Sequence, residues 1–405
     1  MTSIKIITLA LGLAGLLAIM QTAHAEEPVP GAVISSDNLA EYEQYFTSGA
    51  IELIKRGATF KVMPTTPNEK LHNKVWAAAT QANKGKAKVS DIGTLSTLDD
   101  QPWIGGTPFP EPESGMEIMA NFQSAYLGLE GDDWGSVDGP KAPFSRFLYI
   151  NDKGAIYKDT LVGGSEYHMN GRLNFGPLGT VPGHEDETLR RIFVFMAPYD
   201  VKGIVTLDIQ YRDGAKLPDS YIYLPNFRRV RRVATSNRAD SVAGSEFGVS
   251  DLGGFADPLG MWDYKILEKR KMLVATTGQE ASPSKGDMTL VNGYFLPEAP
   301  VEFRDAYVVE ATPKYDTIFS RKVLVINAET FGLFTGEFYD KAGKLYKLYQ
   351  QAGGHKEDGS PVPSWSLILN TQTEFATILA QFGVEPNLDV PVRLMEPANL
   401  KEFSR

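Results

Sequence analysis

Residues 221–233 read Tyr-Ile-Tyr-Leu-Pro-Asn-Phe-Arg-Arg-Val-Arg-Arg-Val. Aromatic and aliphatic residues alternate up to the proline, and four arginines follow within five positions. In a strand, neighbouring side chains point to opposite faces, so Arg229 and Arg231 would share one face and Arg228 and Arg232 the other. A face that packs a dry core cannot accept this charge. The pattern therefore predicts that water, acidic side chains or an anionic ligand head lies against the strand, or that it is an edge strand protected by charge.

The chain around this stretch is rich in hairpin signals. Turn sequences such as Asn151-Asp152-Lys153-Gly154 separate short runs of Val, Ile, Phe and Tyr. Hairpins without long intervening helices favour an antiparallel meander, and so many strands require strong curling or closure. We expect an α+β, mainly β protein built on a curved antiparallel sheet or half-open β-barrel. The expected strands are 147–150, 155–161, 191–197, 204–211, 219–233, 262–276, 306–312, 321–327, 331–339 and 344–350.

Apolar residues at helical spacing occur mainly before residue 130. We expect helices at 36–56, at 66–83 with Thr66 as N-cap, and at 114–129, where Ser114 and Glu117 are spaced as a capping box. A fourth helix is expected at 371–383. Prolines and glycines between residues 101 and 113 mark a boundary. The expected organisation is a signal peptide at 1–25, an N-terminal helical and loop section at 26–113, and a β-rich domain at 114–405.

The first residues have the pattern of a secretory signal. Lys5 precedes an uncharged apolar run at 6–20, and Ala23-His24-Ala25 is a small-x-small cleavage site. The chain has no cysteine, which excludes thiol chemistry, disulfides and acylation of a cysteine. A net charge of −10 argues against nucleic-acid binding. We expect a periplasmic protein, with peripheral attachment to the outer membrane as an option that stays open.

The arginine stretch resembles the signature of a known family. Tyr223-Leu224-Pro225 followed by Arg228-Arg229-Val230-Arg231-Arg232 is similar to the strand that marks the DUF1329 family, a relative of LolA-like outer-membrane lipoprotein-sorting proteins. The family's next features are an acidic and aromatic loop, here 245–251, and a second strand, here 262–271. In this chain the two aromatics of that strand are exchanged, and Met272 stands where an acid is usual. A further match begins at Tyr307-Val308-Val309-Glu310-Ala311-Thr312, and the resemblance covers about residues 145–380.

The resemblance implies a curved sheet wrapped around helices, with an apolar cleft that carries a lipid or other apolar ligand. A carrier must shield acyl chains because each exposed CH₂ costs about 0.8 kcal/mol in water. The aromatic residues of the sheet would line or flank the cleft, and the arginines would bind a head group, pair with acidic residues or meet a partner. The candidate ligand- or partner-binding residues are Arg228, Arg229, Arg231, Arg232, Tyr221, Tyr223, Trp262 and Tyr264, flanked by Phe193 and Phe195, with Glu246 and Asp251 as acidic partners.

Two other functions stay open. The resemblance also suggests association with an RND-type envelope transporter or an outer-membrane protein, so the chain could be an accessory subunit that docks without a ligand of its own. A hydrolase is the second alternative, although no Gly-x-Ser-x-Gly elbow, Walker loop or dinucleotide fingerprint is present. His72, His168, His184 and His355 lack the spacing of a metal-binding helix. We therefore expect no cofactor, no metal and no enzymatic activity.

Overall fold

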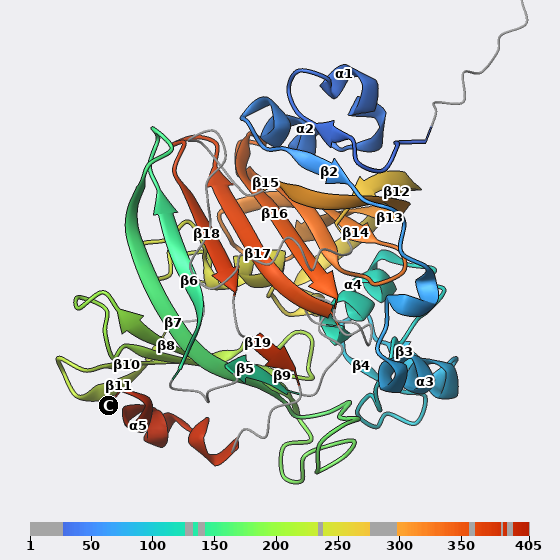
Figure 1. Ribbon diagram of the computed structural model, residues 1–405. Coiled ribbons are helices and arrows are strands. Elements are labelled where there is room, and N and C mark those ends of the chain that lie inside the picture. Colours follow the sequence, from blue (N-terminus) through green and yellow to red (C-terminus); the bar gives the residue numbers. More distant parts are fainter. Residues whose placement is uncertain are drawn as a thin grey trace, which may run out of the picture.

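The computed structural model describes residues 27–125, 133–136, 142–233, 238–275, 298–355, 361–381, 384–386 and 392–404 (Figure 1). The expected signal peptide lies outside these residues. A large curved sheet dominates the structure, and helices of the N-terminal part of the chain pack on both of its faces. The elements before the sheet's main meander are β1 (Val33–Ile34), α1 (Leu39–Tyr42), η1 (Glu43–Tyr45), α2 (Ser48–Lys55), β2 (Phe60–Val62), η2 (Asn68–Lys70), α3 (Lys74–Asn83), β3 (Ala87–Val89), β4 (Leu95–Thr97) and α4 (Gly115–Ser124).

Two antiparallel meanders form the sheet. The first comprises β6 (Pro143–Ile150), β7 (Ile156–His168), β8 (Glu187–Ala197), β9 (Val205–Tyr211), β10 (Asp219–Leu224) and β11 (Arg229–Val233). The second comprises β12 (Trp262–Val274), β13 (Ala299–Pro313), β14 (Phe319–Asn327), β15 (Leu333–Asp340), β16 (Leu345–His355), β17 (Pro361–Asn370) and β18 (Ala376–Gln381).

The last strand of the second meander pairs with the first strand of the first. Ala376 of β18 lies opposite Ile150 of β6, so the strands run continuously from β12 to β18 and then from β6 to β11. Short strands extend this sheet: β2 pairs in parallel with β13 and antiparallel with β1, while β5 (Asp133–Ser136) joins β7 to β19 (Val384–Pro386). In the described residues β11 and β12 are the two ends of the main run. The expected curved sheet is confirmed, but it is a mixed sheet that is not closed into a barrel.

The expected strand at 219–233 is instead a hairpin. β10 ends at Leu224, and the turn is closed by the amides of Phe227 and Arg228, which donate to Leu224 O and Pro225 O. Arg228 has a φ of +49°, a conformation that a strand does not contain. Pro225 has no amide hydrogen to give to a ladder, which is why the chain turns there. The four arginines thus belong to a turn and an edge strand.

The expected helix at 371–383 is wrong. The chain makes a tight turn at 371–375 and returns as β18, whose six residues are all buried. Asn370 Oδ1 accepts from the amides of Gln372 and Thr373, and Glu374 has a φ of +60°. A strand buried on both faces is a continuous apolar run, which periodicity does not separate from a helix.

The N-terminal helices are shorter than expected. The span 36–56 breaks at Phe46 and Thr47 between η1 and α2. In the span 66–83 the N-cap is Asn73, whose Oδ1 accepts from Trp76 N at 2.7 Å, while Thr66 binds Glu302 instead. Ser114 caps α4 as expected, since its Oγ accepts from Glu117 N at 3.2 Å.

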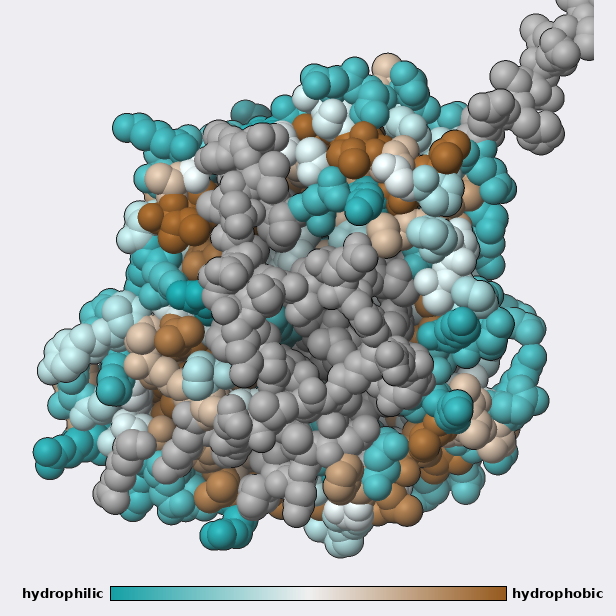
Figure 2. Space-filling view, viewed as in Figure 1, coloured by the Kyte–Doolittle hydropathy of each residue, from teal (hydrophilic) through white to brown (hydrophobic). Residues whose placement is uncertain are grey.

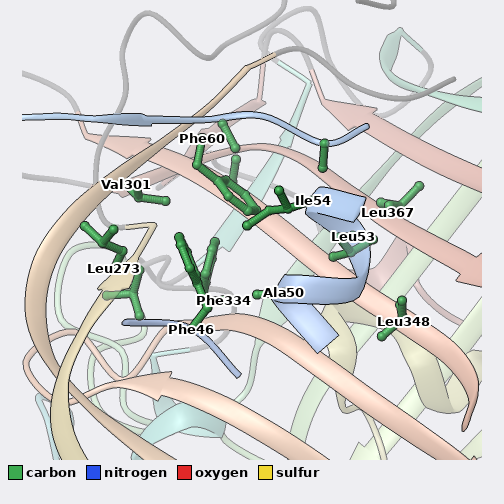
Figure 3. Packing of buried hydrophobic residues seen from close by; sticks show 14 of the residues in the cluster. Phe46, Ala50, Leu53, Ile54, Phe60, Leu273, Val301, Phe334, Leu348 and Leu367 are labelled. Carbon is green, nitrogen blue, oxygen red and sulfur yellow. The ribbon is translucent and has the colours of Figure 1, made fainter. Parts of the chain in front are cut away.

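The sheet has a core on each face. Alternating residues of β14 show the division, because Val325 packs with the α2 side and Leu324 and Ile326 pack with the α4 side. On the α2 face, Ala50, Leu53 and Ile54 of α2 lie among strand residues that include Phe334, Leu348 and Leu367 (Figure 3). Close to the C-terminus, η9 (Val392–Leu394), η10 (Pro397–Asn399) and α5 (Leu400–Phe403) pack a third core against β8 and β9.

A crossing segment, residues 238–261, connects the two ends of the sheet over the α4 face. It contains η5 (Val249–Gly254) and η6 (Leu259–Met261), and it buries Phe247, Leu252 and Phe255 next to α4. These side chains pack into the core on the α4 face of the sheet. The α4 face of the sheet is therefore largely filled by the chain itself in the described residues.

A buried carboxylate fixes the crossing segment to the sheet. Asp251 is fully buried and accepts from Lys322 of β14 at 3.3 Å and from Lys347 of β16 at 3.0 Å. Four aromatic rings surround Lys322, with the Phe338 and Phe319 centroids 4.2 and 4.7 Å from Nζ. Burial alone would raise the pKa of Asp251, but the two lysines hold it below its usual value. The segment is thus held by charge inside an otherwise apolar core.

Replacing this carboxylate should destabilise the protein strongly. Asp251→Asn keeps the shape of the side chain but leaves two buried ammonium groups without their anion, which should lower the free energy of unfolding by about 3–5 kcal/mol. Urea unfolding followed by tryptophan fluorescence measures this loss.

The matched control is Asp316→Asn, which removes an exposed carboxylate that also pairs with a lysine, Lys341, at 3.1 Å. Solvent screens that pair, so little change is expected. Equal effects of the two substitutions would show that the buried cluster does not hold the segment.

Candidate binding cavity

The structure does not gather the predicted site residues in one place. Arg229, Arg231 and Arg232 lie on β11, whose five residues are all exposed, and Arg228 lies in the preceding turn. Arg232 forms an ion pair with Asp219, and the Arg231 guanidinium lies 5.4 Å from the Phe227 ring centroid. Tyr221 and Tyr223 on β10 pack against the C-terminal core instead of lining a cleft.

The remaining predicted residues lie elsewhere. Trp262 and Tyr264 begin β12, at the other end of the strand run, where both rings pack against Phe255. Trp262 is fully buried and donates from Nε1 to Asp257 at 3.2 Å. Of the flanking aromatics, Phe195 belongs to the α4-side core and Phe193 packs against it.

The predicted acidic partners do not pair with the arginines. Asp251 binds Lys322 and Lys347 as described, because the crossing segment carries it over the middle of the sheet and away from β11. Glu246 accepts from Asn370 Nδ2 at 3.1 Å, and its amide donates to Thr377. The proposed pairing of arginines with Glu246 and Asp251 is therefore corrected.

A cavity of about 120 Å³ lies where the N-terminal section meets the first meander. Aromatic rings from four separate segments form its walls: Trp76 of α3, Trp103, Tyr211 of β9 and Phe255 of the crossing segment. Leu95, Leu189 and Leu259 add aliphatic surface. Cavities of roughly 150 Å³ accept a benzene-sized molecule, so this one has room for a small group.

Polar side chains share the lining with these rings, among them Gln123, Asn170, Gln210 and one cation, Arg212. Arg212 Nε is buried and has no hydrogen-bond partner in the described structure, while Nη1 donates to Glu185 O at 3.3 Å. Burial lowers the pKa of Arg212 from its ordinary value, although Asp100 and Asp186 oppose this effect. A buried donor without a partner is costly, and an anionic or carbonyl oxygen would satisfy it.

The wall next to β7 and β8 is rigid because its charges are paired internally. Arg191 donates to Glu166 at 2.5 Å, and His168, which lines the cavity, lies 3.0 Å from the same carboxylate. Burial would raise the pKa of Glu166, but Arg191 and His168 lower it. Arg172 forms a bidentate pair with Asp133 at 2.7 and 2.9 Å, and here burial prevails and raises the pKa of Asp133.

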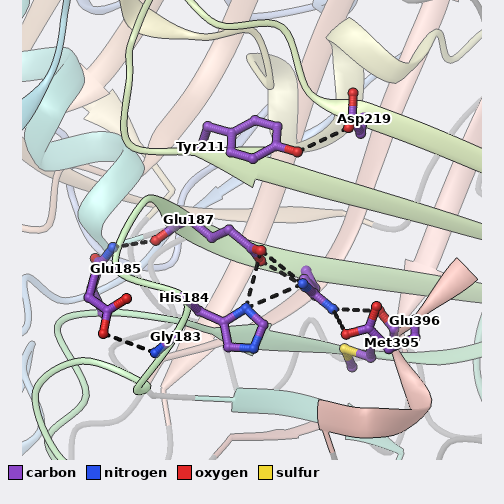
Figure 4. A network of polar contacts seen from close by, with 10 residues as sticks. Gly183, His184, Glu185, Glu187, Tyr211, Asp219, Met395 and Glu396 are labelled. Atoms are coloured by element: carbon purple, nitrogen blue, oxygen red, sulfur yellow. Dashed lines mark hydrogen bonds and ion pairs between the residues drawn. The ribbon is translucent and has the colours of Figure 1, made fainter.

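A second ion network ties the C-terminal segment to the same strands (Figure 4). Arg190 donates to both oxygens of Glu187, at 2.7 and 2.8 Å, and to Glu396 at 2.5 Å. His184 Nδ1 lies 3.2 Å from Glu187. On the neighbouring strand, Tyr211 donates to Asp219 at 3.0 Å, and burial followed by this carboxylate raises the pKa of Tyr211. His184 and Glu187, at the two ends of the segment 184–187, are thus engaged in ion pairs.

Three glycines let the rim of the cavity close. A Cβ at Gly214 or Gly260 would lie 2.2 or 2.1 Å from Ile92 O, and one at Gly93 would lie 2.5 Å from Gly260 N. Gly260 N donates to Gly214 O at 2.7 Å. The loop at 92–93, the β9–β10 turn and η6 therefore meet backbone to backbone, which larger residues would prevent.

Sequence reasoning did not find this cavity. Trp76 lies inside the expected helix 66–83 and carries no signal of a binding site, and Arg212 follows a strand without any motif. Their convergence depends on tertiary structure, so no local pattern could have indicated it. The described residues contain no group of three or more metal-ligating side chains. None of the described helices is both long and apolar enough to span a membrane.

Comparisons with solved structures agree with this architecture. A putative outer membrane lipoprotein-sorting protein domain from Vibrio parahaemolyticus shares 20% identity over 71% of this chain and 98% of its own, with a TM-score of 0.50. A DUF1329 family protein from Desulfovibrio piger shares 18% identity over 71% of this chain and 97% of its own, also with a TM-score of 0.50. No curated protein matches the sequence significantly. The fold that this chain shares with these two structures is that of a mainly β protein built on a large curved sheet.

The particular family follows from the sequence. The model of the family described as "Protein of unknown function (DUF1329)" matches residues 33–397, and the chain belongs to this family. The resemblance read from the arginine stretch is confirmed. It extends further than the expected 145–380, since the match includes the N-terminal helices that form one wall of the cavity.

Adding one methyl group at the rim should separate the three segments. Gly260→Ala places a Cβ against the Ile92 carbonyl and should lower the free energy of unfolding by about 1–3 kcal/mol through overpacking. Urea unfolding measures the loss. Gly332→Ala is the control, because its nearest neighbour is Thr330 Oγ1 at 3.4 Å, an ordinary contact. A cost no larger than that of the control would contradict the close packing.

Acid should lower the stability of the folded protein, because it protonates ion-paired carboxylates that lie in its interior. The pKa values of Glu166, Glu187 and Asp251 are lowered in the folded protein. Their contribution is therefore complete above the unfolded carboxyl pKa, about 4, and is lost as pH falls through the lowered folded values. We expect the urea midpoint to hold from pH 8 to about 5 and then to fall, and to fall less steeply in Glu187→Gln. If the urea midpoint of Glu187→Gln falls as steeply with pH as that of the unmodified protein, Glu187 does not contribute to the acid sensitivity.

Proposed function

We propose that this chain is a periplasmic carrier that binds an apolar ligand in the cavity between α3, α4 and the first meander. The observation that carries the proposal is the combination of aromatic walls and one partnerless buried donor, Arg212 Nε, in the described structure. The fold supports a carrier as well, because a relative of the same fold is described as lipoprotein-sorting.

The size of the cavity limits what it can hold. About 120 Å³ accommodates a small apolar ligand or one end of a longer chain, and not a whole lipid. Arg212 would meet the polar end of the ligand through a charge-assisted hydrogen bond. A ligand with an apolar body and a carboxylate or other anionic oxygen therefore fits best.

Ligand binding can be tested first on the protein as it is purified. Native mass spectrometry followed by organic extraction should give a discrete apolar adduct. A clean apo mass together with a stable complex with a transporter would favour the accessory-subunit alternative. Turnover of an ester that depends on one serine or carboxylate would favour the hydrolase.

A substitution then tests the site itself. Arg212→Gln should weaken binding of the fluorescent fatty acid cis-parinaric acid by roughly 10- to 100-fold, because a hydrogen bond to a charged group contributes about 1.5–3 kcal/mol. Binding of the corresponding alcohol should change much less. Fluorescence titration measures both.

Arg321→Gln is the matched control, since this arginine lies on β14 beside Tyr339 and Glu310 and does not line the cavity. If the two variants bind the acid equally well, Arg212 does not recognise the ligand. If neither the acid nor the alcohol binds the unmodified protein, the cavity is not a site for acyl ligands.

A further inference from the structure

The tips of three neighbouring hairpins form one edge of the first meander. The hairpins are β6–β7, β8–β9 and β10–β11, and their tips lie along the left side of Figure 1. Lys158 forms an ion pair with Asp200 at 3.6 Å, which joins the first tip to the second. A Cβ at Gly203 would lie 3.4 Å from Pro225, which joins the second tip to the third. We call residues 151–158, 198–203 and 225–233 the tip surface.

The tip surface exposes large apolar side chains. Tyr199 is 94% exposed, Phe227 60% and Tyr157 54%, and each comes from a different hairpin. Ile156 and Val230 are partly exposed beside them. Single exposed apolar residues are ordinary, but an exposed aromatic residue at each of three adjacent tips indicates a binding surface.

The same surface is strongly basic. It carries seven basic residues, Lys153, Lys158, Lys202, Arg228, Arg229, Arg231 and Arg232, against two acidic ones, Asp152 and Asp200, so its net charge is +5 in a chain whose net charge is −10. No described residue forms an ion pair with Arg228, Arg229 or Arg231. Figure 2 shows hydrophobic and hydrophilic residues side by side on the left of the view, over these hairpins.

Protection of an edge strand explains only part of this arrangement. Charge on β11 would prevent pairing with another strand. It does not explain the exposed aromatics on the other two hairpins, which would themselves promote association. Aromatic rings with basic side chains are instead the combination that binds the interface of an anionic bilayer, where rings enter the headgroup region and cations meet phosphate.

We propose that the tip surface docks this protein on an anionic phospholipid bilayer. Tyr157, Tyr199 and Phe227 enter the headgroup region, and Arg228, Arg229 and Arg231 bind lipid phosphates. The binding is peripheral and reversible, since three shallow aromatics and a small positive charge give a modest affinity that salt weakens. This docking does not depend on the cavity or its ligand.

Flotation of the purified protein with vesicles tests the docking. Binding is expected to vesicles of phosphatidylethanolamine and phosphatidylglycerol at low salt, to weaken as salt is added, and to be absent with phosphatidylcholine alone. Each basic residue near such a surface contributes about 1 kcal/mol, so Arg229→Gln with Arg231→Gln should lower the partition coefficient roughly 30-fold.

The charge control removes two lysines beside the separate two-stranded sheet of β3 and β4, at the lower right of Figure 1. Lys84→Gln with Lys86→Gln makes the same change of net charge next to β3, away from the tips. All variants are compared in the same chain, so any contribution of residues 1–26 cancels. An equal loss in both double variants would reduce the effect to net charge and overturn the proposal, as would failure of the unmodified protein to float with anionic vesicles.

A tryptophan reporter tests the orientation. The five tryptophans of the chain are all buried, so a new one at a tip can be distinguished from them by difference spectra. Tyr199→Trp should shift its emission to the blue when anionic vesicles are added. Leu178→Trp, at a loop residue that is 64% exposed between β7 and β8, should not shift. A shift at residue 178 and none at 199 would show that another face meets the membrane.

Discussion

The ion cluster of Asp251, Lys322 and Lys347 determines how the rest of the structure is arranged. The chain leaves the sheet at β11 and must re-enter at β12, the other end of the strand run. The crossing segment makes this passage over the α4 face, and its path is fixed where the carboxylate meets the two lysines. Because three charges are buried together, any displacement would leave at least one of them unpaired in a medium of low dielectric constant. The same segment supplies Phe255 and Leu259 to the cavity, so the cavity wall is positioned by this cluster.

The arginines of this protein have different roles that depend on how deeply they are buried. Arg172 and Arg191 are almost completely buried and satisfy carboxylates on neighbouring strands, which makes the wall of the cavity rigid. Arg212 is placed at the cavity with one donor unsatisfied. Arg229 and Arg231 lie in solvent on an edge strand. Composition cannot distinguish these roles, because the role of each arginine depends on the residues that the fold places next to it.

Local chemistry made much of the fold predictable. The hairpin turns at 151–154, 200–203 and 340–343 follow from Asn, Asp and Gly at fixed positions, and the cap at Ser114 follows from its spacing to Glu117. The hairpin within 219–233 could not be separated from one long strand, because strand-forming residues both precede and follow Pro225. β18 was taken for a helix because it is buried on both faces. The cavity was beyond reach, since its walls come from segments that only the tertiary structure brings together. The arginine stretch indicated the family correctly, but the partners expected for it lie elsewhere.

The pairing of β18 with β6 has a consequence for how this protein reaches its folded state. Ile150 and Ala376 are opposite one another in the sheet although 226 residues separate them in the chain. Each meander can form from contacts between neighbours in sequence, but their junction requires the closure of a very long loop. The first meander therefore keeps β6 as an open edge until the second is almost complete. During that interval the unpaired β6 edge is exposed to other chains, so β18 protects this edge from aggregation when it pairs with β6.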